Sequence, residues 1–176
     1  MPVNHRLQPL YRVLAGLCGL YVLLFGIVGA VQTRDFGVFA QDGLPSVLGL
    51  RANLAFAVLS IAAGIVVLGG AIIGGNLDQK INLLGGIAFL VAGMAMMALM
   101  QSDLNILGFT ISTCIVSFII GLVLFAAGLY GRVGTAREAA LEEQYRHGAA
   151  PDTKEHVYYP DQGPKPAEQT QDKRFA

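Results

Sequence analysis

Few side chains in this sequence could carry out chemistry, and they do not gather in one place. The three histidines, His5, His147 and His156, all lie in the polar ends of the chain. Cys18 and Cys114 each lie early in a long apolar stretch, which places them near opposite faces of a bilayer if successive helices alternate in direction. A disulfide needs Cα atoms less than about 7 Å apart. The sequence therefore predicts neither a disulfide nor a shared metal site between the two cysteines.

Four methionines are the remaining side chains that suggest a cofactor: Met94, Met96, Met97 and Met100. Thioethers are soft ligands suited to Cu(I), but no cysteine or histidine accompanies them at the same depth, and methionine is also an adaptable apolar filler. The sequence contains no Ser-His-Asp set, phosphate-binding glycine loop or His-Cys cluster with suitable spacing. We therefore expect no catalytic residue, no cofactor and no metal, and the protein is predicted not to be an enzyme.

The elements that carry these residues are four long apolar stretches. A helix of about 20 apolar residues crosses the hydrocarbon core of a bilayer. The chain is 54% hydrophobic and only 14% charged, against about 25% charged residues in soluble domains. The pattern predicts an all-α integral membrane protein whose four spans form two tandem hairpins, with boundaries near 10–31, 52–73, 81–100 and 110–130. The first stretch is too long for a signal-peptide core of about 7–15 residues, so we expect it to be retained.

The rest of the chain divides by composition. Residues 1–131 are predicted to form the transmembrane domain, 132–147 a short cytoplasmic helix and 148–176 a disordered, proline-containing tail. Thr135 and Glu138 have the spacing of a capping box. Asp78 and Lys80 are assigned to a tight turn between the second and third spans. The longest loop, residues 32–50, mixes apolar and charged residues, and both an interfacial segment and an exposed loop remain open.

The two predicted hairpins resemble each other in sequence. Leu48-Gly49-Leu50 matches Leu107-Gly108-Phe109, the Ser60–Gly64 pair matches Ser117–Gly121, and we also match Gly16 with Gly86. These matches predict a parallel repeat about an axis along the membrane normal. Such repeats occur in transporters, and duplication also produces them in proteins that transport nothing.

Small residues in the spans predict close helix packing. Pairs of small residues four apart let helix backbones approach in lipid. The sequence leaves open whether these faces meet within the chain or bind a partner; the candidates are Gly16, Gly26, Ser60, Gly64, Gly86, Gly93, Ser117 and Gly121. Asn53 and Asn82 are predicted polar residues just inside the second and third spans, where they cap helices or bond to neighbouring ones.

Charged residues predict the orientation and limit the function. Apart from the cysteines, Arg12 is the one ionisable residue within the predicted spans, which disfavours a proton relay or ion path. Cytoplasmic span ends carry an excess of Lys and Arg, so both termini are predicted cytoplasmic: their side collects Arg6, Arg12, Lys80, Arg132 and Arg137, and the other side Arg34 and Arg51. The formal net charge of zero gives no basic excess for nucleic acid.

The four spans resemble a known family. The segments LYRVLAGLCGLYVLLFGIVGAV, LGLRANLAFAVLSIAAGIVVL, INLLGGIAFLVAGMAMMAL and LNILGFTISTCIVSFIIGLVLFAAGLYG are similar to those of four-helix actinobacterial membrane proteins grouped as a domain of unknown function. The likeness covers residues 10–131. It implies a multi-pass protein of an actinobacterial plasma membrane and implies no activity. That family commonly has a histidine on the second and fourth spans, where this chain has Phe56 and Val116.

Two functions follow as hypotheses. The first is a non-catalytic accessory subunit of a larger envelope complex, such as a lipid importer or a respiratory assembly, with other integral membrane subunits as partners. Its basis is a small apolar bundle with glycine faces and a polar tail. The alternative is a small transporter or lipid-binding carrier that acts as a homo-oligomer, which the repeat and the polar face of the fourth span favour. Membrane lipids are expected partners in both cases.

Overall fold

The computed structural model describes residues 7–102, 104–135 and 138 of the 176-residue chain. Its four long helices are α1 (Gln8–Thr33), α2 (Leu54–Ile73), α3 (Gly75–Leu99) and α4 (Ile111–Tyr130). Each is long and apolar enough to cross a membrane. The predicted all-α architecture with four membrane-spanning helices is confirmed, and the tail predicted for residues 148–176 lies outside the described residues.

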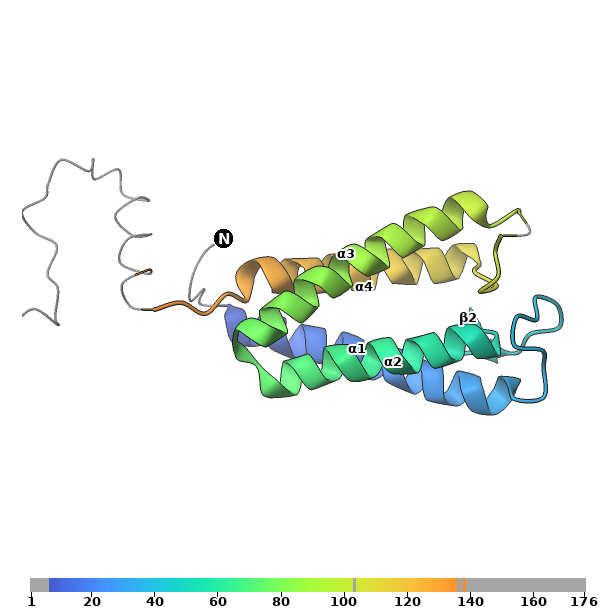
Figure 1. The fold of residues 1–176 in the computed structure, drawn as a ribbon, viewed down its shortest axis with the longest axis horizontal. Helices are drawn as coiled ribbons and strands as arrows, with labels where there is room; N and C mark the ends of the chain where they lie inside the picture. The colour runs from blue at the N-terminus through green and yellow to red at the C-terminus, as the bar shows by residue number, and fades with distance from the viewer. Residues whose placement is uncertain (1–6, 103, 136–137, 139–176) are drawn as a thin grey trace, which may run out of the picture.

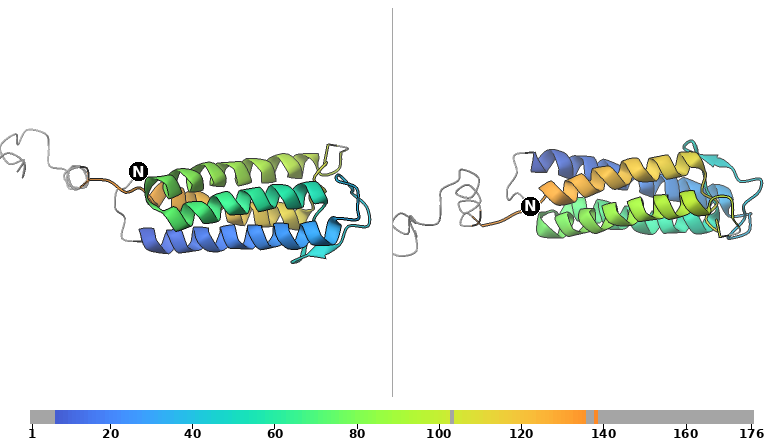
Figure 2. Two further views of the ribbon diagram at one scale, coloured as in Figure 1. Left: turned by 60° about the horizontal axis from the view of Figure 1, so that its bottom comes forward. Right: turned by 90° about the horizontal axis from the view of Figure 1, so that it is seen from above.

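The helices form an antiparallel bundle of two hairpins (Figures 1 and 2). Packing is closest within the pairs α1–α2 and α3–α4, and looser between α1 and α4 and between α2 and α3. The start of α1, the end of α4 and the short α2–α3 turn lie together at one end of the bundle, which we call the turn end. The longer connections, residues 34–53 and the described residues of 100–110, lie at the opposite end, the loop end.

The contacts inside the two hairpins repeat in detail. A Cβ built on Gly19 would lie 2.8 Å from the backbone nitrogen of Leu68, and one built on Gly86 would lie 2.5 Å from that of Phe125. A residue of α1 and its equivalent in α3 are thus 67 positions apart in the sequence. A residue of α2 and its equivalent in α4 are 57 positions apart. The predicted match of Gly16 with Gly86 is therefore wrong by one helical turn, because Gly19 makes the corresponding contact.

Polar groups close the two hairpins at equivalent places. The Arg12 Nε donates to the carbonyl oxygen of Ala71 at 2.6 Å, near the end of α2. The Gln79 Nε2 donates to the carbonyl oxygen of Gly128 at 3.1 Å, near the end of α4. The last carbonyl groups of a helix lack partners within it, so the first helix of each hairpin supplies a donor to the second. This second set of equivalent contacts supports the repeat.

The turn between α2 and α3 is shorter than predicted. Gly74 and Gly75 adopt φ values of +78° and +66°, which glycine reaches without steric cost, and α3 begins at once. Asp78 and Lys80 consequently lie in the first turns of α3 instead of in a loop. Asp78 is 4% exposed. The prediction that Arg12 and the cysteines are the only ionisable groups within the spans is therefore wrong.

The loop between α1 and α2 contains a short β-hairpin that the sequence did not predict. Strands β1 (Ser46–Val47) and β2 (Leu50–Arg51) pair antiparallel. Val47 and Leu50 are buried against Phe25 and Ala52. The apolar side chains earlier in the loop, Phe36, Val38 and Phe39, are exposed. One half of the loop thus covers the bundle and the other half lies open, so neither of the two alternatives describes the whole loop.

A capping box follows α4, as predicted. The backbone N–H of Thr135 donates to the Glu138 carboxylate at 2.9 Å, and the backbone N–H of Glu138 donates to the Thr135 hydroxyl at 3.3 Å. The remainder of the helix predicted for residues 132–147 lies outside the described residues.

The capping box is expected to depend on pH. The bonds from the Thr135 backbone and hydroxyl, with the charge of Arg132, lower the pKa of Glu138 below its ordinary value. A lowered pKa means that the capped state favours the ionised carboxylate. The box is therefore complete at neutral pH and is lost as the pH falls through that lowered pKa. The carboxyl carbon shift of Glu138, followed by NMR, should show a titration midpoint that rises when Thr135 is replaced by valine. An unchanged midpoint would show that the hydroxyl contributes nothing.

Candidate ligand-binding cavity

A cavity of about 220 Å³ lies between the two hairpins in the loop-end half of the bundle. All four helices contribute to its walls, and fourteen of its lining residues form pairs that the repeat relates. Seven residues of the first hairpin line it together with their equivalents in the second: Tyr21 and Ala88, Val22 and Phe89, Phe25 and Ala92, Phe56 and Thr113, Leu59 and Val116, Ser60 and Ser117, Ala63 and Ile120. The cavity therefore lies on the axis that relates the hairpins.

The two sides of the cavity differ in side-chain size. On the α1–α4 side, Tyr21 and Phe25 fill the space between the helices. The equivalent residues of α3 are alanines, Ala88 and Ala92, and both are exposed. Leu59, on the facing part of α2, is 55% exposed. We call the part of the cavity lining formed by these exposed residues of α2 and α3 the mouth. The loop-end halves of these two helices diverge from each other (Figure 1).

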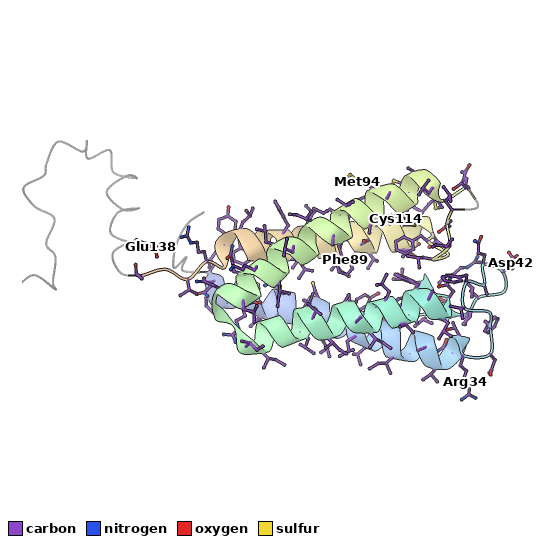
Figure 3. All side chains as sticks on the ribbon, in the orientation of Figure 1. Arg34, Asp42, Phe89, Met94, Cys114 and Glu138 are labelled. Atoms are coloured by element: carbon purple, nitrogen blue, oxygen red, sulfur yellow. The ribbon has the colours of Figure 1, made fainter. Side chains whose placement is uncertain are left out.

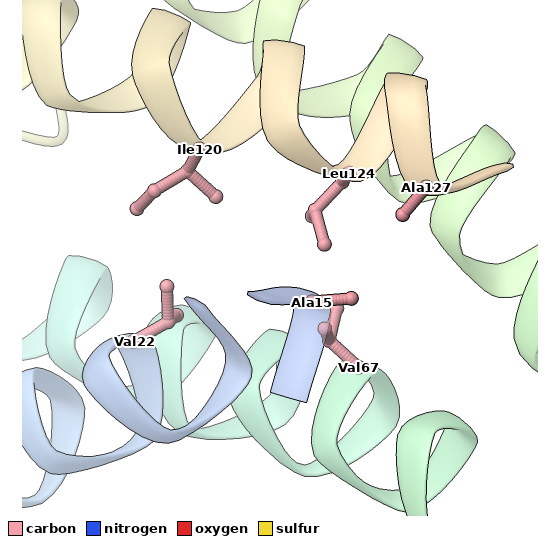
Figure 4. Packing of buried hydrophobic residues seen from close by; sticks show 6 residues of the cluster. All are labelled: Ala15, Val22, Val67, Ile120, Leu124 and Ala127. Carbon is pink, nitrogen blue, oxygen red and sulfur yellow. The ribbon is translucent and has the colours of Figure 1, made fainter. Parts of the chain in front are cut away.

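Packed side chains border the cavity toward both ends of the bundle. At the loop end, the rings of Phe25, Phe56 and Phe109 lie 4.7–5.3 Å apart in tilted and edge-on contacts. Toward the turn end, a buried cluster joins the hairpins beneath the cavity; it consists of Ala15, Val22, Val67, Ile120, Leu124 and Ala127 (Figure 4).

The cavity walls are almost wholly apolar, and three of the side chains that line them, Ser60, Thr113 and Ser117, have hydroxyl groups that are already hydrogen-bonded. Ser60 donates to the carbonyl oxygen of Phe56 in its own helix at 2.8 Å. Ser117 donates to the carbonyl oxygen of Phe89 in α3 at 2.8 Å. The Thr113 hydroxyl lies 3.1 Å from that of Thr110. An apolar pocket in a membrane protein suits an apolar ligand better than water.

The six glycines predicted as packing or partner surfaces all contact the other helix of their own hairpin, whereas of the two predicted serines Ser117 bonds to α3 and Ser60 bonds within its own helix. A Cβ built on Gly64 would lie 2.5 Å from the Leu23 nitrogen, and one on Gly121 would lie 2.8 Å from the Leu90 Cγ. The helix that each glycine contacts is the other member of its own hairpin in every case: Gly16 with Ala71, Gly26 with Ile61, Gly86 with Phe125, and Gly93 with Phe118. These six glycines therefore pack the two helices of each hairpin together.

Asn53 is the polar residue that holds the loop end together. Its side chain is fully buried and caps α2 by accepting a bond from the Phe56 nitrogen at 2.9 Å. Its amide nitrogen donates to the carbonyl oxygens of Ile106 at 2.8 Å and Ala40 at 3.3 Å. One side chain thus joins both long connections to the start of α2.

Replacing Asn53 with alanine is expected to lower the free energy of unfolding by about 2–4 kcal/mol. A lost N-cap costs about 1 kcal/mol, and each buried carbonyl left without a donor costs about 1–3 kcal/mol. Denaturation of the variant in detergent micelles measures the change. An aspartate at this position keeps the cap but loses both donors, so we expect an intermediate stability; an aspartate variant as stable as the parent would show that the donated bonds contribute nothing.

A second polar group lies at the turn end, away from the cavity. Asn82, only 1% exposed, donates to the Asp78 carboxylate at 2.7 Å, and the positive charge of Arg12 acts favourably on that carboxylate. The Asn82 carbonyl oxygen has no hydrogen-bond partner among the described residues. Asn82 therefore bonds within its own helix, and the predicted role in bonding to a neighbouring helix is not what the structure shows.

The other residues with possible chemistry lie apart from the cavity. Met94 and Met97 of α3 are both exposed. Met94 lies on the outer side of α3, and Arg34 and Asp42 lie in the loop beyond α1 (Figure 3). Cys18 and Cys114 are free thiols, and His5, His147 and His156 lie outside the described residues. Within 7–102, 104–135 and 138, no three histidine, cysteine, aspartate or glutamate residues lie close enough to hold a metal ion.

Reasoning from sequence alone missed the cavity, although a signal for it was present. Aligning α1 with α3 at a spacing of 67 positions places Tyr21 and Phe25 against Ala88 and Ala92. In that alignment, α3 has two alanines where α1 has two aromatic residues. The mouth lies beside these alanines.

Comparisons of the chain with protein-family models, with curated proteins and with solved structures found no match. The resemblance to four-helix actinobacterial proteins stays a prediction.

Proposed function

We propose that this protein binds the apolar chain of a lipid in the cavity between its hairpins, and thus acts as a lipid-binding or carrier protein of a bacterial plasma membrane. The observation that carries the proposal is an apolar cavity with exposed lining residues between α2 and α3. The hydroxyl groups of Ser60, Thr113 and Ser117 in its walls are already hydrogen-bonded. The size of the cavity exceeds the roughly 150 Å³ of an engineered apolar cavity that takes up benzene. A few carbons of an acyl or isoprenoid chain fit such a volume.

Packing supplies the driving force. Moving a chain from lipid into an apolar cavity yields little hydrophobic free energy, since both surroundings are apolar. An empty cavity costs about 24 cal/mol per Å³, so a void of about 220 Å³ would cost on the order of 5 kcal/mol. A chain that fills the cavity recovers part of this cost. Because the mouth opens sideways between α2 and α3, the ligand enters from the bilayer.

The orientation proposed from the charged residues sets the leaflet. With both termini cytoplasmic, the turn end faces the cytoplasm and the cavity lies in the opposite, outer half of the membrane. A reporter fused after Ala176 should then read cytoplasmic, and one inserted near Asp42 should read external. The reverse pair of readings would place the cavity in the inner half.

An accessory role in a larger complex remains a second proposal. The glycine faces that suggested it pack within the hairpins, so they no longer support it. The helix α3 supports it instead, since only 17% of its most apolar window is buried, against 44% for α4. Its outer face, with Met94 and Met97, is where we expect a partner helix to pack. Recovery of stoichiometric membrane subunits with a tagged copy in gentle detergent would support this role, and recovery of the protein alone would remove it.

The lipid-binding proposal is tested by equilibrium binding to the purified full chain. Radiolabelled hexadecane, titrated in detergent micelles, should bind saturably with one molecule per chain. Binding that rises linearly with probe, as for simple partition into the micelle, would contradict the proposal.

A further inference from the structure

Tyr21 lies at the middle of the membrane-spanning part of α1. Thirteen residues of the helix precede it and twelve follow, so at about 1.5 Å per residue it lies some 18–20 Å from either end. The polar side chains at helix ends reach the headgroup region, but a phenol at this depth does not. Hydrocarbon offers no hydrogen-bond partner, and an unsatisfied polar group there is costly.

The protein itself supplies no partner for the Tyr21 hydroxyl among the described residues, although the side chain lines the cavity. The hydroxyls of Ser60 and Ser117, which line the same cavity, both donate to backbone carbonyl groups. A tyrosine hydroxyl away from water usually finds an acceptor. Because the side chain lines the cavity, a ligand held there is placed to supply that acceptor.

We infer that Tyr21 donates a hydrogen bond to a carbonyl oxygen of the bound lipid. The ligand is then an uncharged lipid whose ester, ketone or quinone carbonyl lies near the middle of the bilayer. The ester groups of a phospholipid lie at the edge of the hydrocarbon core, about 15 Å from its centre, so the depth of Tyr21 favours a neutral lipid that resides within the core. This inference rests on the proposed function and names the ligand class for the same cavity.

The test compares three probes on the full chain in detergent micelles: hexadecane, methyl palmitate and a decyl-substituted benzoquinone. In Tyr21→Phe the ring remains and only the hydroxyl is lost. We expect the affinity for the carbonyl probe that matches the natural ligand to fall about 3- to 10-fold, as one net hydrogen bond predicts, with the hexadecane affinity unchanged. Tyr11→Phe is the matched control, since Tyr11 stacks on Tyr130 at the turn end and does not line the cavity.

The outcomes separate this inference from the proposed function. If Tyr21→Phe loses affinity for methyl palmitate alone, the ligand is an ester lipid. If it loses affinity for the benzoquinone alone, the ligand is a quinone. Both results support the inference. Equal affinity of the parent and Tyr21→Phe for all three probes overturns it, and the lipid-binding function survives. Loss of hexadecane binding in Tyr21→Phe also overturns it, because the residue would then shape the cavity. Absence of saturable binding of every probe to the parent protein overturns the function itself.

Discussion

Replacing Gly64 with valine is expected to lower the free energy of unfolding by about 3 kcal/mol or more, because α1 and α2 can no longer pack at their native distance. A Cβ built on Gly64 would lie 2.5–2.7 Å from the backbone nitrogen, Cα and Cβ of Leu23. These are mostly backbone atoms, so only a shift of the whole helix makes room. Overpacking of a closely packed site costs about 1–3 kcal/mol and occasionally more, and the γ carbons of valine add to it.

Gly69 provides the matched control on the same helix. A Cβ built on it would meet nothing within 4 Å, so Gly69→Val is expected to change stability by no more than about 0.5 kcal/mol. Both variants are compared by denaturation in detergent micelles. Gly121→Val should resemble Gly64→Val, since Gly121 makes the equivalent contact with Leu90 in the second hairpin. Equal effects at Gly64 and Gly69 would show that close approach of α1 and α2 does not stabilise the bundle.

Replacing Ala92 with phenylalanine is expected to weaken hexadecane binding at least tenfold while leaving the fold intact. Ala92 is exposed and lines the cavity mouth, and its equivalent in α1 is Phe25. The substitution therefore gives α3 the aromatic ring that closes the α1–α4 side. A ring at this position occupies the space that the ligand needs, and a loss of about 1.4 kcal/mol is already tenfold in affinity.

Ala98→Phe is the control for this substitution. Ala98 is also an exposed alanine of α3, but it does not line the cavity. We expect its hexadecane affinity to equal that of the parent. If the two variants bind equally well, the ligand does not use the mouth between α2 and α3.

The number and approximate positions of the helices were predictable from sequence because they depend on local properties. Four apolar stretches of suitable length exist whatever their neighbours are, and the structure has helices at all four. The start of α3 was missed because it depends on the backbone conformation of Gly74 and Gly75. With both residues at positive φ, the chain reverses within the turn, and the polar segment through Lys80 becomes helical.

The partners of the small residues were not predictable, because spacing alone does not identify the helix that approaches. The Ser60–Gly64 spacing indicated close packing correctly, but only the structure shows that Gly64 contacts Leu23 of α1. The cavity was harder still to predict. It depends on the relative size of Tyr21 and Ala88, two side chains 67 positions apart, and becomes visible only after the correct register of the repeat is known.

The most direct test of a ligand chain inside the bundle is photo-crosslinking with a lipid that carries a diazirine at the end of its chain. Lipids around the protein reach exposed residues such as Leu122, but they do not reach Val22 and Ile120, which are each 6% exposed and line the cavity. We expect saturable labelling of these two buried residues in native membranes, competed by excess unlabelled hexadecane and absent in Ala92→Phe. Labelling confined to residues on the outer faces of the helices would contradict the account.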